Sequence, residues 1–469
     1  MDNRDNYLAN EHHEVAVVIV PLNLQSHLRQ LLQFACRISS YGLPVYYVGL
    51  ATSNCQVRLR STTLNPSDIA KIHFHDLQID TQDPPPDKNI PMHVWNASMR
   101  SREPIATFLR EISSKARRVV VIHDLLMSYN VKDISSIPNG ESYTFHCLPI
   151  FDMYCSHFSV VAGLPIPLEE ELLKKLPSNE GCYNPDDIMH HANLLSQCMG
   201  VSAGDIYNTG QVIEGTAFID SMKHLASTQN KKLWALGPIL PTTSKQEDHH
   251  KIQNHHLCLD WLNKQPPKSV LYVSFGTSTS LSDEQIKELA MGLELSKHKF
   301  IWVLRNADKV DPVTNKCEGN KTLLELPEGF EERVKGVGLV VREWAPQQEI
   351  LAHSSTGGFM SHCGWTSCLE SIIEGVPIAA WPIQFDQPKN GFLVTEILKI
   401  GLFVRTWEKR EELVIASTIQ NIVSKLMASE EGDMIRKRAQ ELRESVRRST
   451  EKSGVSRMEL DSFVVHITR

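Results

Sequence analysis

The sequence predicts an α/β fold with two doubly wound parallel sheets that face each other across a cleft. Short apolar runs rich in β-branched residues alternate with amphipathic stretches of helical spacing, which is typical of parallel βαβ units. The alternation comes in two series, one in each half of the chain, and a polar segment separates them. The length of 469 residues also exceeds one ordinary core, so we expect two domains.

The first series makes up the predicted first domain, residues 1–240. It begins with the apolar run 15–21 (VAVVIVP), and apolar residues recur at helical spacing over 27–42. Further strands are predicted at 44–50 (PVYYVGL) and 117–124 (RRVVVIHD). Strands buried on both faces carry such continuous apolar runs.

The segment 241–256 is polar and without periodicity, so we interpret it as a linker or surface loop. The second domain is predicted over residues 257–450, with a helix at 283–298. Its expected strands are 269–276, 300–305, 338–344, 357–362 and 377–383. The last segment, 451–469, is amphipathic and is expected to form a helix that packs back on the first domain.

Composition excludes several classes of function. The net charge of −7 and the lack of long Lys/Arg runs argue against a nucleic-acid partner. The polar start lacks the apolar stretch of a signal peptide, and the first apolar run is too short to cross a bilayer. Ten cysteines without a C-x-x-C pair fit reduced thiols. We expect a cytoplasmic, monomeric protein without a membrane span.

Open α/β sheets bind ligands beyond the carboxyl ends of their strands, which here border the predicted cleft. No strand is followed by the dinucleotide fingerprint G-x-G-x-x-G, and the run GVGLVV near Gly336 has two glycines that precede a strand. A nicotinamide-dependent dehydrogenase is therefore disfavoured.

The stretch SHCGWTSCLE (361–370) lies where a buried strand runs into a helical pattern. Hydroxyl residues at a helix start are often ordinary caps. The same corner can hold a phosphate through backbone N–H groups and the helix dipole. Aromatic, carboxamide, carboxylate and imidazole side chains around it could bind a base, a ribose, a diphosphate and a sugar. Separate core tryptophans with ordinary caps would not explain that combination.

The window from Trp344 to Gln387 resembles the plant secondary-product glycosyltransferase box of the family 1 UDP-glycosyltransferases. It matches that box in length and at nearly every diagnostic position. The resemblance implies a GT-B fold, with a UDP-sugar donor held by the second domain. It also implies that Trp344 stacks on uracil, that Ala345 and Gln347 lie against it, and that Glu370 holds the ribose.

The rest of the box has implied roles too. By the resemblance, His362 and Ser367 bind the diphosphate, Trp365 contacts the sugar, and Asp386 and Gln387 hold its hydroxyls. The last of these residues suggests glucose, although xylose remains possible.

One position departs from the family. Thr366 stands where the family usually has Asn, and its hydroxyl can donate one hydrogen bond but reaches less far than a carboxamide. We expect the donor site to be intact and its diphosphate contact to be altered.

Sugar transfer to an alcohol needs a base, because an unassisted hydroxyl is a poor nucleophile. His27 follows the first strand and Asp124 ends another, and both match the catalytic dyad of these glycosyltransferases, although Ser26 replaces the usual glycine. By that resemblance the histidine takes the acceptor proton and the aspartate fixes its tautomer. The alternative is that His27 only caps or packs. A Ser26–His27 hydrolase pair is disfavoured because neighbouring helical residues point apart.

Thr277 follows a strand and could add a phosphate contact, with turn packing as the alternative. The histidines of the polar segment are better explained as a solvated loop than as a metal site; they are His249, His250, His255 and His256. No D-x-D sequence occurs, so we expect no metal and no cofactor beyond UDP-glucose as the donor substrate. The leaving-group charge would then be met by the helix N-terminus, His362 and hydroxyls.

Stretches such as IHDLLM, ESYTFH, GDIYNT, LPEGFEERV and SGVSRMEL resemble the zeatin O-glucosyltransferases, which act on a cytokinin hydroxyl. The resemblance implies inverting transfer of glucose from UDP-glucose to a small hydroxylated acceptor. The loops 81–90 and 146–158 would shape the acceptor pocket, so phenolic or terpenoid alcohols remain alternatives. A sugar-nucleotide epimerase and a silent nucleotide-binding protein are the other classes considered, and the presence of His27 and Asp124 disfavours both.

Overall fold

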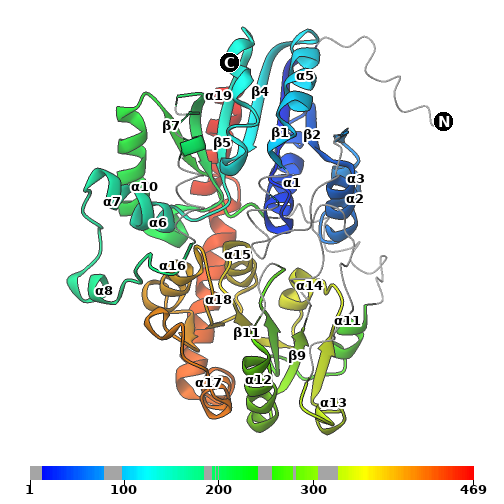
Figure 1. Ribbon diagram of the computed structural model, residues 1–469, viewed down its shortest axis with the longest axis vertical. Coiled ribbons are helices and arrows are strands. Elements are labelled where there is room, and N and C mark those ends of the chain that lie inside the picture. Colours follow the sequence, from blue (N-terminus) through cyan, green and yellow to red (C-terminus); the bar gives the residue numbers. More distant parts are fainter. Residues whose placement is uncertain are drawn as a thin grey trace, which may run out of the picture.

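The computed structural model describes residues 13–78, 94, 98–183, 193–195, 197–198, 200–240, 256–277, 281–304 and 326–469. They form two units, one above the other in Figure 1, each with a parallel sheet between helices. This confirms the predicted α/β architecture. Residues 241–255 of the predicted linker lie outside the described residues, as does the loop 81–90.

The first sheet has seven parallel strands in the order β3-β2-β1-β4-β5-β6-β7. Their bounds are β1 His13–Val20, β2 Val45–Leu50, β3 Ile72–Leu77, β4 Ala116–Asp124, β5 Gly140–His146, β6 Ser202–Tyr207 and β7 Lys232–Ala235. The strand order changes direction at β1, which pairs with β4 so that Val20 lies opposite His123. A crevice is expected at the carboxyl ends of these two strands.

Successive residues of β1 enter two separate cores, because side chains of a strand alternate between faces. Val17 packs in one core with α1 (Gln25–Ser39), and Val18 packs in the other with α5 (Arg102–Ser113). Covering both faces is what requires the continuous apolar runs seen in the sequence.

The second sheet has six parallel strands in the order β10-β9-β8-β11-β12-β13. Their bounds are β8 Val270–Ser274, β9 Lys299–Val303, β10 Gly338–Val341, β11 Thr356–Ser361, β12 Ile378–Ala380 and β13 Gly401–Phe403. Val273 packs on α12 (Asp283–Ser296) and Tyr272 on α14 (Gln347–Ala352), so this sheet also has two apolar faces. β8 and β10 are shorter than predicted because their last predicted residues belong to loops at the cleft.

The other α-helices are short connections or flank the sheets. They are α2 Ala51–Arg60, α3 Pro66–Ile69, α6 Ile150–Met153, α7 Ser159–Ala162, α8 Glu170–Lys175, α10 Gln211–Thr228, α11 Leu257–Leu262, α13 Phe330–Arg333, α15 Trp365–Glu374, α16 Gln387–Phe392 and α17 Ala416–Ala428.

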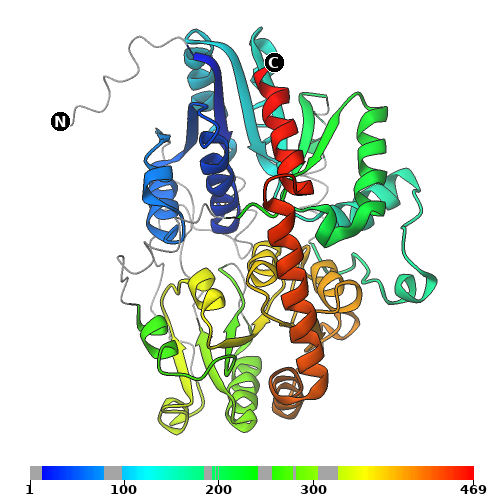
Figure 2. The same cartoon turned by 180° about the vertical axis from the view of Figure 1, so that it is seen from behind.

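The last two helices run from the second unit to the first (Figure 2). α18 (Glu430–Thr450) packs against α17 and α15 of the second unit and reaches α10 of the first. α19 (Val455–Thr468) lies on the first sheet, where Phe463 and Ile467 are fully buried. The end of the chain therefore completes the core that its beginning started.

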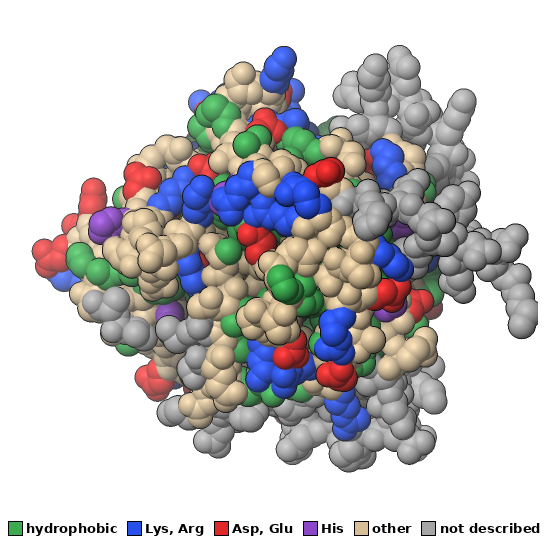
Figure 3. Space-filling view, turned by 90° about the horizontal axis from the view of Figure 1, so that it is seen from above, with side chains coloured by type: hydrophobic (Ala, Val, Ile, Leu, Met, Phe, Trp, Pro, Cys, Tyr) green, Lys and Arg blue, Asp and Glu red, His purple; other side chains and the backbone are tan. Residues whose placement is uncertain are grey.

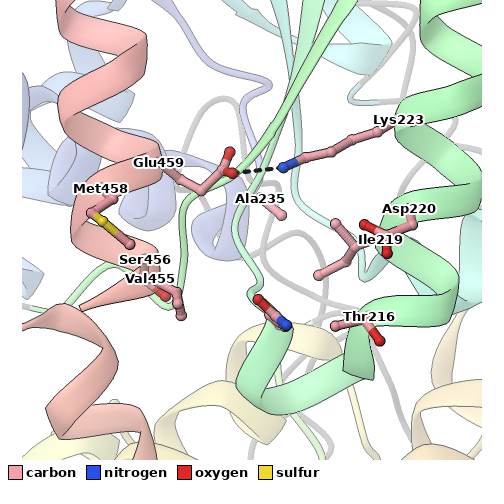
Figure 4. Close-up of a pocket in the computed structure, with 10 residues that line it drawn as sticks. Thr216, Ile219, Asp220, Lys223, Ala235, Val455, Ser456, Met458 and Glu459 are labelled. Carbon is pink, nitrogen blue, oxygen red and sulfur yellow. Dashed lines mark hydrogen bonds and ion pairs between the residues drawn. The ribbon is translucent and has the colours of Figure 1, made fainter. Parts of the chain in front are cut away.

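A cavity of about 260 Å³ lies between α10 and α19, where Lys223 pairs with Glu459 at 2.6 Å (Figure 4). None of the predicted site residues lines it. On the face where the chain ends, basic side chains lie among acidic and uncharged ones (Figure 3). Arg117 donates to the backbone oxygen of Arg469 at 3.4 Å and pairs with Glu14 at 2.5 Å. No helix within the described ranges is both long and apolar enough to span a membrane.

Candidate active site

His27 and Asp124 meet at the crevice between β1 and β4. The distance from His27 Nδ1 to Asp124 Oδ2 is 2.6 Å, and the aspartate side chain is almost fully buried. Asp124 Oδ1 accepts a hydrogen bond from the backbone N–H of Leu126 at 2.9 Å. The strand end thus fixes the carboxylate, and the carboxylate fixes the imidazole ring of the first turn of α1.

The two groups shift each other's pKa in opposite directions. Burial acts to lower the pKa of His27, but the charge and hydrogen bond of Asp124 outweigh it and hold that pKa above its ordinary value. Burial acts to raise the pKa of Asp124, and His27 together with the Leu126 N–H holds it below its ordinary value. An ionised Asp124 accepts the Nδ1 proton and leaves His27 Nε2 as the basic atom.

Cys147 is a third member of this group that the sequence did not reveal. Its thiol donates to Asp124 Oδ2 at 3.4 Å, and burial raises the pKa of the thiol well above its usual value. Potential ligand atoms of the three residues lie within 4.8 Å of one another. A thiol held in its protonated form is a poor metal ligand, and the arrangement suits hydrogen bonding to the carboxylate better.

The residues predicted to face uracil lie at the start of α14. Trp344 is partly buried and Ala345 is buried. His256 was expected in a solvated loop, but it accepts from the N–H of Cys258 at the start of α11 and its ring packs on Trp344 at 6.2 Å between centroids. That expectation was wrong because the residue is a helix cap at the edge of the candidate site.

Glu370, predicted to hold the ribose, already has a partner on each oxygen. Gln347 Nε2 donates to Oε2 at 2.7 Å, and Arg29 Nη1 of the first domain lies 2.9 Å from Oε1. The geometry at Oε1 is that of an ion pair without a formal hydrogen bond. Arg29 also donates to Gln348. Ribose hydroxyls that bind the Glu370 carboxylate would therefore either share it with Arg29 of the first domain or displace that arginine.

His362 fits between two glycines. A Cβ added at Gly276 would lie 2.6 Å from its Nε2, and one added at Gly364 would lie 2.7 Å from the same atom. Burial lowers the pKa of His362 to about 4, so the imidazole is neutral and offers a hydrogen bond rather than a charge. Its Nδ1 is buried without a hydrogen-bond partner in the described part of the chain. Thr277, next to Gly276, is exposed.

The helix α15 begins without a side-chain cap. Its N-cap residue is Gly364, so the alternative of ordinary hydroxyl caps does not hold and the first backbone N–H groups can face a ligand. Ser367 accepts from Gln347 Nε2 at 3.0 Å. Trp365 and Thr366 instead bond to the first domain: the indole N–H donates to the backbone oxygen of Asn208, and Gln30 donates to the threonine hydroxyl.

Asp386 and Gln387, at the end of the box, are both buried. Gln387 Oε1 accepts from two backbone N–H groups at 2.9 Å each, which leaves its NH₂ group pointing elsewhere. Asn390 donates to Asp386 at 2.6 Å. Burial raises the pKa of Asp386 to about 7, and the charge of Asp152 on α6 adds to the rise. Asp386 in turn contributes to the raised pKa of His27, and Gln30 on the same helix as His27 donates to Thr366, so His27 lies near the box.

Comparison with known families identifies the chain. Residues 13–241 match the family described as "Glycosyltransferase, N-terminal domain", and residues 192–426 match "UDP-glucoronosyl and UDP-glucosyl transferase". The protein belongs to the UDP-glycosyltransferases. It is an enzyme that uses a UDP-sugar donor, as the box predicted.

Curated relatives cover this UDP-glycosyltransferase from end to end. The Zeatin O-xylosyltransferase of Phaseolus vulgaris is 45% identical over 98% of this chain and 99% of its own length. The Zeatin O-glucosyltransferase of Phaseolus lunatus is 46% identical over 97% of both chains. The predicted kinship with plant family 1 glycosyltransferases, close to the zeatin group, is confirmed.

Solved structures share the GT-B fold of this glycosyltransferase. A Phytolacca americana UGT complexed with UDP-2-fluoro-glucose and pterostilbene has a TM-score of 0.76 and 26% identity, covering 97% of this chain and 100% of that one. A UDP-glucosyltransferase from Polygonum tinctorium capable of glucosylating indoxyl has a TM-score of 0.75 and 27% identity, with 98% and 99% coverage.

Proposed function

We propose that this enzyme transfers glucose from UDP-glucose to the side-chain hydroxyl of a zeatin-type cytokinin. The observation that carries the proposal is the His27–Asp124 contact of 2.6 Å, together with a donor box that departs from the family at Thr366. The names of the two end-to-end relatives support zeatin as the acceptor.

In the proposed reaction His27 Nε2 takes the proton of the acceptor hydroxyl. The acceptor oxygen attacks the anomeric carbon in line with the departing UDP, so the C–O bond to the diphosphate breaks as the glycosidic bond forms and the configuration inverts. Asp124 holds the Nδ1 proton and stabilises the imidazolium that forms. Cys147 adds a third hydrogen bond to that carboxylate.

On the donor side we assign uracil to Trp344, Ala345 and Gln347, and the ribose to Glu370. The diphosphate would meet the N-terminus of α15 with His362, Thr366 and Ser367, and Thr277 would lie nearby. Asp386 and Gln387 would hold sugar hydroxyls, with Trp365 against the ring. The Gln387 oxygen is already occupied, and within the described residues its NH₂ group has no hydrogen-bond partner, which supports this role.

Because His362 is neutral, the leaving diphosphate would be stabilised by helix N–H groups and hydroxyls. We propose that no metal takes part. Activity should then be unchanged after dialysis against EDTA, measured as UDP release. A loss of activity that Mg²⁺ restores would contradict this part of the proposal.

The test of the acceptor is a mass-spectrometric screen of UDP-glucose and UDP-xylose with trans-zeatin, cis-zeatin, flavonoids and terpenoid alcohols. We expect an O-hexoside of zeatin. If only phenolic or terpenoid alcohols react, the acceptor proposal fails. Xylose remains a specific alternative, because one end-to-end relative is a xylosyltransferase. We further propose a cytosolic monomer, which size-exclusion chromatography with light scattering and cell fractionation can test.

A further inference from the structure

Three hydrogen bonds link four residues across the two domains. Because two of these residues, Trp365 and Thr366, are neighbours in the chain, the bonds form a closed ring. Gln30 Nε2 on α1 donates to Thr366 Oγ1 at 2.9 Å, and Asn208 Nδ2 donates to Gln30 Oε1 at 2.8 Å. Trp365, the neighbour of Thr366, closes the ring by donating its indole N–H to the backbone oxygen of Asn208 at 3.1 Å. Gln30 and Asn208 are each only 2% exposed, so water does not compete for these bonds.

The donor and acceptor roles in the ring are fixed by one backbone N–H group. Asn208 Oδ1 accepts from the N–H of Ile239 at 2.9 Å, and a backbone N–H can only donate. The Asn208 amide must therefore turn its NH₂ group toward Gln30. Gln30 then presents its oxygen to Asn208 and its own NH₂ group to Thr366, where the backbone oxygen of Cys147 at 3.4 Å is a second acceptor.

The direction of the ring determines what Thr366 can offer. Its hydroxyl accepts from Gln30, so a lone pair is used and its single proton is left over. Within the described residues the proton has no hydrogen-bond acceptor, and the hydroxyl lies in the first turn of α15 beside the uncapped N–H groups. A hydroxyl whose oxygen already accepts a bond is also a stronger donor.

We propose that Gln30 and Asn208 are positioning residues that direct the Thr366 hydroxyl proton onto the donor diphosphate. The proposal rests on the proposed location of UDP-glucose at the N-terminus of α15. It explains how a short threonine replaces the usual carboxamide there: the first domain supplies a carboxamide behind the hydroxyl. The opposing interpretation is that the ring only holds the domains together.

The test compares ligands with and without phosphate. Gln30→Met keeps the side-chain length and removes both polar atoms. We expect it to weaken UDP affinity about 10- to 100-fold by calorimetry, as for a lost hydrogen bond to a charged group, and to leave uridine affinity within twofold. The donor KM should rise by a similar factor. Thr366→Val should give the same loss, Thr366→Ser should retain affinity, and the double variant Gln30→Met/Thr366→Val should lose no more than either.

Two further variants distinguish a specific effect on the Thr366 hydroxyl from a nonspecific effect of replacing a buried polar residue. Gln33→Met removes a buried glutamine one turn later on α1 and should leave UDP affinity unchanged. Asn208→Asp keeps the acceptor for Ile239 but offers no donor, so Gln30 should turn its amide over and its oxygen should capture the Thr366 proton. UDP affinity should fall in this variant as well. When Asn208→Asp is added to Thr366→Val, it should cause no further loss of UDP affinity. If the new negative charge alone weakened UDP binding, the further loss would still occur.

Equal weakening of UDP and uridine in Gln30→Met would overturn the proposal in favour of a domain clamp, and additive losses in the double variant would do the same. Unchanged UDP affinity in Thr366→Val would also overturn it. Failure of the wild-type enzyme to bind UDP would instead refute the proposed donor site. Melting curves of each variant identify any that fail to fold, in which case Asn208→Asp, which is close in shape to the natural residue, carries the test.

Discussion

The two carboxylate oxygens of Asp124 bind different partners. Oδ1 accepts a backbone N–H that anchors the carboxylate to its own strand end, while Oδ2 receives His27 and the Cys147 thiol. A carboxylate anchored on one oxygen can orient the imidazole through the other. This division explains why a single residue at a strand end can fix both the position and the tautomer of the base.

His27→Ala should abolish sugar transfer and leave UDP affinity within a few-fold, because the proposed role of His27 and Asp124 is to activate the acceptor. Loss of a general base typically lowers the rate by about 10²–10⁴. UDP release and calorimetry measure the two quantities. His224→Ala, an exposed histidine on α10, is the control and should behave as wild type. Retention of more than half of the activity by the His27 variant would refute its role as base.

The pH profile should report the raised pKa of His27. The base must be neutral to accept a proton, and its pKa lies above 6.5, so kcat/KM should fall as pH decreases through a value above 6.5. Asp124→Asn removes the charge that raises this pKa and leaves burial, which lowers it. The acid limb should then move to lower pH while the plateau drops. An unmoved limb would show that another group titrates.

At the scale of elements, the corner from β11 to α15 carries the proposed donor site, and two glycines shape it. Gly276 has φ +81° and lies against the ring of His362, as does the N-cap residue Gly364. Any side chain at either position would push the imidazole out of its slot. The absence of a side chain at both glycines is therefore what makes room for the His362 ring.

Gly276→Ala should weaken UDP binding, because its Cβ would lie 2.6 Å from His362 Nε2. Gly42→Ala is a matched control, since Gly42 has the same φ of +81° and nothing within 4 Å of its added Cβ. Both variants should lose about 1 kcal/mol of stability from backbone strain. Only the first should change UDP affinity by calorimetry, and equal affinities would argue against a diphosphate role for His362.

Much of this corner could be predicted, because its residues are close in sequence and carry a strong motif. The dyad residues were predictable as strand-end and helix-start positions. The partners from the other domain were not: Gln30 and Thr366 are 336 positions apart, and Arg29 meets Glu370 only after the domains dock. Spacing along α1 does not reveal which of its residues will face the second sheet.

At the scale of the whole molecule, the fold class could be predicted from the continuous apolar runs. A strand that is covered on both faces has apolar residues at successive positions instead of alternating apolar and polar ones. The position of α19 depends on tertiary packing instead. Phe463 lies 5.1 Å from Trp234, 5.4 Å from Tyr143 and 6.0 Å from Phe34 between ring centroids, which joins the last helix to three separate elements of the first domain. No local pattern in the tail specifies those three partners.

Phe463→Ala should lower the free energy of unfolding by about 3–5 kcal/mol, as for a large aromatic removed from a core. Val465→Ala on the same helix is the control, because its side chain is 70% exposed and its change should stay within about 0.5 kcal/mol. Urea unfolding measures both. A small loss in the Phe463 variant would mean that α19 contributes little to the first domain.

The return of α19 to the first sheet also bears on how the chain is made. A ribosome delivers β1 and α1 early and Phe463 last, yet all three belong to one core. The nascent first domain therefore keeps part of an apolar face of its sheet uncovered until α19 has been synthesised, which happens only after the second domain has been made. Docking of α19 would then cover that face and remove the apolar surface that the incomplete first domain exposes.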